Sequence, residues 1–314
     1  MTNCAPVLII TLNRYVHFSR CIKSLSACTD ADKTDLYIAL DYPLKVKDWD
    51  GYKKIDNYIK TIKTFKNVNI IKRNENYGAV KNFFDSVAQI FKKHDKLIFS
   101  EDDNEFSPNF LNFINNGLNK FANNPLVNAI CGYNYPFNIP KNYTKNYYFS
   151  QGFSTWGFGI WKTKFESFDW DITNLNRFLH NPLNVIKLNN IQYDLLIGLM
   201  NIVKSGNITG DRMHCYNNII KGAYSVFPSI SKVRNFGHDG SGVHCSNMLK
   251  QNIFVSQLID NKKTFDYDTN EELENDSIYK ELKRHNYNFT KNNYIKRFKL
   301  LIKYLLFLMD ISFY

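Results

Sequence analysis

The chain has 314 residues, of which 44% are hydrophobic and 16% aromatic, with only 14 Gly and 8 Pro. This composition is that of a folded protein with a substantial core, and it excludes a long disordered segment. The net charge of +11 favours anionic partners such as nucleotides, nucleic acid or an anionic membrane surface, although a lysine-rich composition also follows from genomic base bias.

The hydropathy pattern predicts neither a secretion signal nor a membrane span. The apolar run at 7–10 follows no basic region and is too short for a signal peptide. No stretch reaches the ~20 apolar residues that span a bilayer. The six cysteines have no C-x-x-C spacing. We therefore expect a cytoplasmic protein with reduced, mostly buried thiols.

The first 150 residues alternate between strand-like and helix-like segments. Short apolar runs predict strands at 7–11, 36–40, 68–72, 97–100 and 127–132. Helical periodicity predicts helices at 16–27, 48–65, 79–92 and 108–121, the last capped by Ser107 with Pro108 at its first position. Strands separated by helices favour parallel pairing. We expect an α/β layer of the nucleotide-binding type.

Three consecutive carboxylates, Glu101, Asp102 and Asp103, follow the strand predicted at 97–100. In open α/β sheets, ligands gather at the carboxyl ends of strands. Adjacent acids repel one another, so the cluster needs a cation or strong hydrogen-bond donors. Hard oxygen ligands suit Mg²⁺ or Mn²⁺ shared with substrate phosphates. The pattern favours a divalent-metal site that handles a diphosphate, and a solvated acidic loop is the alternative.

Aromatic residues and glycines are interleaved at 152–161. Glycine allows close approach of the backbone to a ligand and aromatic faces suit sugar rings, whereas an aromatic core turn is the alternative. Helices are then predicted at 181–204 and from Asp211 to residue 221, with Gly222 as C-cap, and a strand at 224–227. A glycine-rich segment at 235–244 holds His238 and His244.

Residues 291–314 form a basic and strongly apolar tail. One helical face carries Ile295, Phe298, Ile302, Leu305, Leu306 and Met309, with basic residues before and among them. A basic amphipathic helix too short to span a bilayer is typical of attachment to an anionic membrane surface. A helix docked on the rest of the protein is the alternative.

Six motifs follow one another between Pro6 and Cys245: residues 6–14, Leu40-Asp41, residues 74–79, residues 101–103, Trp156-Gly157 with the Asp211 helix, and residues 228–244. In this order they resemble the GT-A glycosyltransferases, especially the family 2-like bacterial sugar transferases of surface-polysaccharide assembly, and more distantly N-acetylglucosaminyltransferase I. The resemblance implies a Rossmann-like, mixed and mostly parallel sheet flanked by helices. It also implies a nucleotide-binding half at 1–132, an acceptor and catalytic half at 133–245, a helical extension at 246–290 and the amphipathic helix at 291–314.

The resemblance further implies roles for single residues. Asp211 is then the catalytic base of an inverting reaction, and Asp103 and His244 bind Mn²⁺ or Mg²⁺. The residues implied in nucleotide and donor binding are Thr11, Asn13, Arg14, Asp41, Asn76, Gly78, Glu101, Asp102, Trp156 and Gly157. Relatives often have a tryptophan beside the base, where this chain has Gly210 and Arg212, so Asp194 and Asp239 are alternatives.

The activity implied is metal-dependent, inverting transfer of a sugar from a nucleoside diphosphate sugar, with a UDP-sugar as the default, by a hexosyl- or N-acetylhexosaminyltransferase. The acceptor is then a hydroxyl of a capsule- or lipopolysaccharide-type glycan, free or lipid-linked, at the inner face of the plasma membrane. An inactive transferase-like scaffold and a basic nucleic-acid-binding protein are the alternatives. The dispersed basic residues and the lack of a recognised nucleic-acid motif argue against the second.

Overall fold

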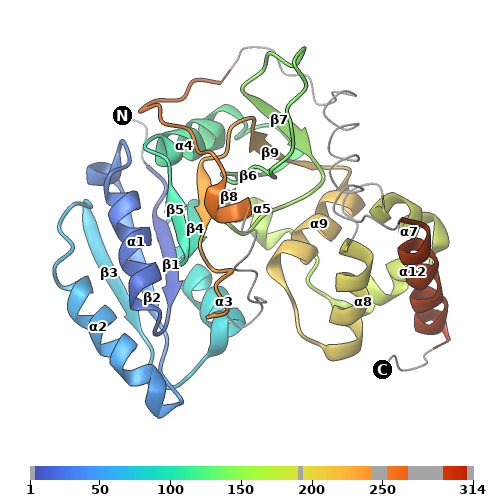
Figure 1. The fold of residues 1–314 in the computed structure, drawn as a ribbon, viewed down its shortest axis with the longest axis horizontal. Coiled ribbons are helices and arrows are strands. Elements are labelled where there is room, and N and C mark those ends of the chain that lie inside the picture. The colour runs from blue at the N-terminus through green and yellow to red at the C-terminus, as the bar shows by residue number, and fades with distance from the viewer. Residues whose placement is uncertain (1–3, 190–193, 242–252, 268–292, 310–314) are drawn as a thin grey trace.

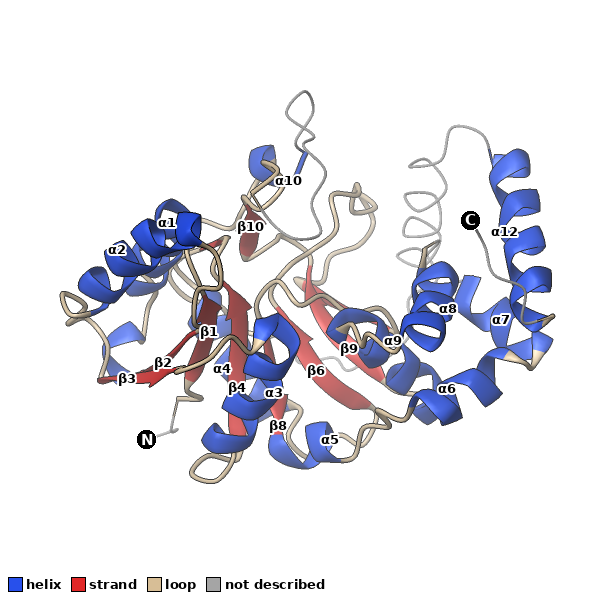
Figure 2. Cartoon of the chain, turned by 90° about the horizontal axis from the view of Figure 1, so that it is seen from below, coloured by secondary structure: helices blue, strands red, loops and turns tan. Residues whose placement is uncertain are grey.

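The computed structural model describes residues 4–189, 194–241, 253–267 and 293–309. An eight-stranded mixed sheet lies at its centre, with helices on both faces (Figure 1, Figure 2). In the spatial order β3-β2-β1-β4-β8-β6-β9-β7, the strands are Asn67–Lys72, Asp35–Leu40, Val7–Thr11, Lys96–Glu101, Phe158–Trp161, Val127–Cys131, Tyr224–Pro228 and Tyr147–Ser150. The predicted fold class, a mostly parallel mixed sheet flanked by helices, is confirmed.

The strand directions follow the alternation of strands and helices in the sequence. Strands β3, β2, β1 and β4 pair in parallel, and so do β6 and β9. Strands β8 and β7 run antiparallel to their neighbours. The six strands that the sequence predicts all run in one direction, whereas the two antiparallel strands were not predicted.

Two helical layers cover the sheet because side chains alternate between its faces. Val7 and Ile9 of β1 belong to a core with α1 (Tyr15–Ser26), α2 (Trp49–Ile59) and α4 (Phe110–Lys120). Leu8, between them, belongs to the opposite core with α3 (Gly78–Ile90). The short helices η1 (Ala31–Lys33) and η2 (Val46–Asp48) lie in the connections before β2 and α2.

The second half of the chain adds helices to the α3 side of the sheet. They are α5 (Lys162–Glu166), α6 (Ile172–Leu179), α7 (Pro182–Asn189), α8 (Leu195–Ser205) and α9 (Gly210–Lys221), followed later by the short α10 (Ile253–Ser256). A small antiparallel pair joins β5 (Asn104–Phe106) to β10 (Val233–Asn235). This pair fixes the start of the glycine-rich segment next to the end of β4.

The C-terminal helix α12 (Asn293–Leu308) docks on the helices of the second half (Figure 1). Leu300, Tyr304 and Phe307 are buried in the same core as α6 and α8, and the Tyr304 hydroxyl donates to the carbonyl of Leu179 at 2.8 Å. The docked face differs from the apolar stripe predicted from the sequence. Four residues of that stripe are exposed: Phe298, Ile302, Leu305 and Met309. Leu301, which lies outside the stripe, is exposed as well. Within the described residues, no helix has the length and apolarity to cross a membrane.

Three local predictions are wrong. The helix predicted at 48–65 ends at Ile59, where tighter turns follow and bury Phe65. The helix predicted from Pro108 begins at Phe110. Ser107 has other partners: its backbone N–H donates to the carbonyl of Lys232 and its hydroxyl donates to Oδ1 of Asn109, each at 2.9 Å. The helix predicted at 181–204 is the two helices α7 and α8, and residues 190–193 between them lie outside the described part.

The cysteine prediction fits the described residues. Cys21, Cys28, Cys131 and Cys215 are buried and free, and Cys4 is free and partly buried. Cys245 lies outside the described residues.

Candidate functional site

The carboxyl ends of β1 and β4 lie side by side and carry the acidic cluster. The two strands pair in parallel, and Ile10 near the end of β1 is opposite Glu101 at the end of β4. The chain leaves β1 at Thr11 and β4 at Glu101. Residues 13–14 and 102–103 therefore meet at one edge of the sheet, where ligands bind in open α/β folds.

Arg14 joins the two aspartates at this edge. Its guanidinium contacts Oδ1 of Asp102 and lies 2.9 Å from Oδ2 of Asp103, and the Thr11 hydroxyl donates to Oδ2 of Asp102 at 2.7 Å. Burial raises the pKa of Asp102, against the effect of Arg14. Burial alone would lower the pKa of Arg14, but the two carboxylates outweigh it and raise that pKa. Arg14 is thus a cation held between two buried acids.

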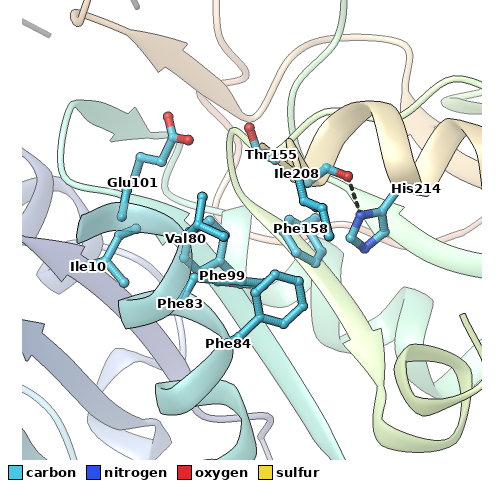
Figure 3. A pocket seen from close by; sticks show the side chains of 12 residues that line it. Ile10, Val80, Phe83, Phe84, Phe99, Glu101, Thr155, Phe158, Ile208 and His214 are labelled. Carbon is cyan, nitrogen blue, oxygen red and sulfur yellow. Dashed lines mark hydrogen bonds between the residues drawn. The ribbon is translucent and has the colours of Figure 1, made fainter. Parts of the chain in front are cut away.

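Glu101 has a different environment from its two neighbours. Burial, followed by the charge of Asp103, raises the pKa of Glu101 to about 8, and Asp102 and Asp211 add smaller effects in the same direction. Its side chain lines a pocket on the α3 side of the sheet (Figure 3). Within the acidic cluster, two carboxylates pair with Arg14 and the third belongs to this pocket.

Asn13 anchors the loop that carries Arg14. Its Nδ2 donates to Oδ1 of Asp48 at 2.7 Å. Its carbonyl oxygen lies only 1.9 Å from where a Cβ on Gly51 would be, so α2 approaches the loop through a glycine. These contacts hold the loop that carries Arg14 against η2 and α2.

Asp41 organises the loop that leads into α3. Its carboxylate accepts hydrogen bonds from the backbone N–H groups of Tyr42, Tyr77 and Gly78 at 2.8–2.9 Å. Asn76 donates to the carbonyl of Tyr42 at 2.6 Å, and Gly78 has φ = +67°, which glycine adopts without strain. Asp41 is almost fully buried. Its role is to hold together the two loops that border the site.

The Trp156-Gly157 pair lies between the end of β6 and the glycine-rich segment. The Gly132 N–H donates to the carbonyl of Gly157 at 2.7 Å, and Gly157 has φ = +75°. The Trp156 ring packs edge-on against His238 and Phe254, with centroid distances of 5.5 and 5.2 Å. This pair therefore supports the segment that covers Asp103.

Two residues at Asp103 were missed by sequence reasoning. Asn235 donates to Oδ1 of Asp103 at 2.8 Å, and a Cβ on Gly237 would lie 2.2 Å from Oδ2 of Asp103. His238 is close enough to Asp103 to be affected by its charge. Burial lowers the pKa of His238, and the charge of Asp103 opposes this shift. The glycines at 237–242 were the only sequence feature that indicated a close approach of this segment to another group. His244, the predicted metal ligand in this segment, lies outside the described residues.

The first turn of α9 lies across the pocket from the acidic cluster. The helix begins at Gly210 and ends before Gly222, which has φ = +60°, so the predicted helix and its C-cap are confirmed. The pocket has a volume of about 110 Å³, and Glu101 and Gly210 both line it. Asp211 lies close enough to raise the pKa of Glu101. A carboxylate in the first turn of a helix interacts favourably with the helix dipole.

The two alternative bases have other partners. Asp194 lies 3.5 Å from Arg212 and is half exposed at the start of α8. Asp239 lies 3.1 Å from His17 on α1 and accepts hydrogen bonds from Ser241. The charge of Asp211 contributes to the raised pKa of Glu101.

The carboxylates of Asp102 and Asp103 suit a cation that is shared with a substrate better than a metal held by protein side chains alone. In the described residues, no three His, Cys, Asp or Glu side chains gather as metal ligands do. Mg²⁺ needs only one or two protein carboxylates when substrate phosphates and waters complete its coordination. Asp102 and Asp103 offer such hard oxygen donors next to each other. Arg14 contacts one oxygen of each, and the other two accept from Thr11 and Asn235, so a cation would use their remaining lone pairs. A cation bound together with a diphosphate fits these residues.

Comparison with known proteins gives low similarity to solved structures. No family model and no curated protein matches the sequence. The fold is similar to residues 1–349 of TarS from S. aureus in complex with UDP-GlcNAc, at 10% identity and a TM-score of 0.41, covering 76% of this chain and 61% of that one. It is also similar to the mannosyltransferase PcManGT from Pyrobaculum calidifontis in complex with GDP-Man and Mn²⁺. The identity is 11% and the TM-score 0.39, and the match covers 53% of this chain and 48% of that one. The chain thus spans less than two thirds of either structure.

Proposed function

We propose that this protein is a glycosyltransferase that moves a sugar from a nucleoside diphosphate sugar to a hydroxyl group with inversion at the anomeric carbon. The observation that supports the proposal is the arrangement across one pocket. Glu101 of the acidic cluster lines one side of it, and its neighbours Asp102 and Asp103 pair with Arg14 at the same sheet edge. Gly210, the residue before Asp211 in the first turn of α9, lines the other side. A leaving diphosphate and an attacking hydroxyl need these two kinds of group on opposite sides of the sugar.

In this mechanism Asp211 is the general base. The acceptor oxygen forms a bond to the anomeric carbon while the bond from that carbon to the diphosphate oxygen breaks. The proton of the acceptor hydroxyl passes to a carboxylate oxygen of Asp211, and the diphosphate leaves with the electron pair of the broken bond. General-base assistance of this kind typically contributes about 10²–10⁴-fold.

The donor diphosphate would lie at the edge formed by β1 and β4. Arg14 would contact its oxygens, and Asp103 would be the protein ligand of a Mn²⁺ or Mg²⁺ ion shared with them. Bound there, the cation would offset the negative charge that develops on the leaving group. Glu101 and Asp102 border the sugar and the ribose, and the loops held by Asp41 and Asn13 shape the nucleotide site. UDP is the expected nucleotide, on the resemblance to GT-A enzymes.

We further propose a surface glycan or lipid-linked acceptor and attachment to the inner face of the plasma membrane. The exposed apolar face of α12 supports this part of the proposal, because Phe298 and Leu305 are 64% and 48% exposed beside the exposed Lys299 and Lys303. Exposed aromatic and aliphatic side chains beside lysines are typical of helices that lie on anionic lipid.

Calorimetric titration with UDP, GDP and dTDP, each with Mn²⁺ and again with a chelator, tests the proposed function. We expect one nucleotide to bind tightly and only with the metal. Binding of none of the three nucleotides would contradict it and favour a scaffold. Retention on DNA that is lost in salt, without nucleotide binding, would instead favour a nucleic-acid-binding protein.

A further inference from the structure

The pocket between the acidic cluster and α9 is apolar on most of its surface. Its lining comes from both halves of the chain: β1, α3 and β4 on one side, and β8 and α9 on the other. The apolar side chains that form most of it are Ile10, Val80, Phe83, Phe84, Phe99 and Phe158. A pocket at the proposed sugar site would ordinarily need several polar groups for the sugar hydroxyls.

The polar and apolar groups are separated within the pocket. In Figure 3 the carboxylate of Glu101 and the hydroxyl of Thr155 lie at one end, and the ring of Phe84 lies at the other, with Phe99 and Phe158 between them. A bound group would therefore meet polar atoms at one end and phenyl rings at the other. A hydroxyl group among these rings would lose its hydrogen bonds to water without replacement.

The apolar end is built of rings that pack on one another. Phe83 contacts Phe99 edge-on at 4.7 Å between centroids and Phe84 at 5.3 Å, and Phe99 contacts Phe158 at 5.5 Å. Phe84 also packs on Trp170 at 5.0 Å. Such interlocked rings define a fixed shape, so the pocket can select a substituent by its size and polarity.

His214 adds a buried ring to this wall. Its Nδ1 lies 2.6 Å from the carbonyl of Gly210, which assigns the proton to Nδ1 and leaves Nε2 as an acceptor. The Nε2 atom is buried and has no hydrogen-bond partner among the described residues. Burial lowers the pKa of His214 to about 4, so the ring is neutral at pH 7.

We propose that this pocket binds the acetamido group of an N-acetylated donor sugar, with the methyl among the phenylalanines and the amide toward the polar end at Glu101 and Thr155. This rests on the proposed glycosyltransferase function and names its donor class. A 6-deoxy sugar offers a similar methyl group without the amide, and the experiment separates the two. An unmodified hexose would place a hydroxyl where the methyl fits.

The test is calorimetric titration of the full chain with UDP, UDP-GlcNAc and UDP-glucose, and with dTDP-rhamnose against dTDP-glucose. We expect UDP-GlcNAc to bind about 10- to 200-fold more tightly than UDP-glucose, the range that one small group in a hydrophobic pocket supplies. Equal affinity for UDP-GlcNAc and UDP-glucose, with UDP itself bound, overturns the inference and leaves the proposed function intact. A preference for dTDP-rhamnose over dTDP-glucose with no preference for UDP-GlcNAc overturns the acetamido assignment. If none of these compounds binds, the inference fails, and the titration with GDP decides whether the proposed function stands.

Two variants connect the preference to this pocket. Val80 lines it and is 50% exposed, so Val80→Phe fills the pocket without burying new volume in the core. Thr155→Val keeps the shape of the side chain and removes the hydroxyl at the polar end. Both should abolish most of the preference for UDP-GlcNAc and leave UDP affinity unchanged. Ile220→Phe, at a 41% exposed position in the last turn of α9, is the matched control and should keep the preference. An undiminished preference in both pocket variants would place the selectivity elsewhere.

Discussion

The side chain of Asn235 donates a hydrogen bond to Oδ1 of Asp103 at 2.8 Å, although 132 residues separate them. The same amide donates to Asn104 at 2.9 Å, and all three side chains are buried. The glycine-rich segment is thereby attached to the acidic cluster. The orientation of Asp103 depends on a residue that belongs to the other half of the chain.

Asn235→Ala should weaken both folding and metal-dependent nucleotide binding. The substitution leaves two buried acceptors without their donor, which costs about 1–3 kcal/mol of the free energy of unfolding. Urea denaturation measures this loss, and calorimetry measures nucleotide affinity. Asn207→Ala, at an exposed loop position, is the control. A variant with wild-type stability and affinity would show that Asp103 is positioned without Asn235.

Asp103→Asn should abolish metal-dependent nucleotide binding. The substitution keeps the shape of the side chain but removes a negative charge and one hard oxygen from the proposed metal site. Titration with the nucleotide, in Mn²⁺ and in chelator, checks this. Asp50→Asn removes an exposed carboxylate that pairs only with Lys54 in the described structure, and it should bind as the wild type does. Equal binding by the Asp103 variant in Mn²⁺ would move the metal to other ligands.

Asp211→Asn should leave nucleotide affinity unchanged and lower turnover by about 10²–10⁴-fold, the usual contribution of a general base. Release of the nucleotide in the presence of an acceptor measures turnover. Asp194→Asn is the control, because its carboxylate lies 3.5 Å from Arg212 and was the alternative base. If the Asp194 variant loses turnover and the Asp211 variant does not, the two assignments must be exchanged.

The sheet edge could be predicted from sequence because each of its two strands stands out from the residues around it by its hydropathy. Residues 7–11 and 97–100 are apolar runs bounded by polar residues, and burial on both faces of a parallel sheet requires such runs. The acidic cluster at the end of one run and Arg14 after the other then had to meet. Asn235 could not be found in this way, because its contact with Asp103 depends on the β5–β10 pairing between distant segments.

The C-terminal helix shows a second limit. Apolar residues occur on more than one of its faces, so periodicity alone could not decide which face is buried. The structure buries Leu300, Tyr304 and Phe307 and leaves most of the predicted stripe exposed. The two antiparallel strands were missed for a related reason, because Tyr147–Ser150 and Phe158–Trp161 are four-residue aromatic segments without a clear strand period.

Stability should fall at acidic pH because of His214. Burial lowers its pKa to about 4 in the folded state, from an ordinary value of 6.5, so between these values only the unfolded chain takes up the proton. The stability from the neutral ring is complete above pH 6.5 and is lost as the pH falls toward 4. From pH 7.5 to pH 5, the wild type should lose about 2 kcal/mol more of the free energy of unfolding than His214→Phe.

Urea denaturation at the two pH values measures this difference. His180→Phe, at an exposed position after α6, is the control and should lose as much as the wild type. If the His214 variant and the wild type respond equally to pH, the folded protein must accommodate a protonated His214.

The exposed face of α12 should bind the protein to anionic vesicles. Replacing Phe298 and Leu305 by serine removes two exposed apolar side chains, each worth about 1.5–3 kcal/mol when fully buried in lipid. The double variant should bind phosphatidylserine-containing vesicles at least tenfold more weakly in co-sedimentation. Deleting residues 292–314 is a poorer test, because it also uncovers the core that Leu300, Tyr304 and Phe307 cover.

The control is the double variant Leu44→Ser and Leu258→Ser, which removes two apolar side chains that are 74% and 80% exposed elsewhere. It should bind vesicles as the wild type does. Lys299→Gln with Lys303→Gln should weaken binding to anionic but not to zwitterionic vesicles, because each lysine near an anionic surface contributes about 1 kcal/mol. Wild-type binding by the α12 double variant would assign membrane attachment to another surface. A dimer that dissociates in this variant, without any vesicle binding, would instead make the face a contact between two copies of the chain.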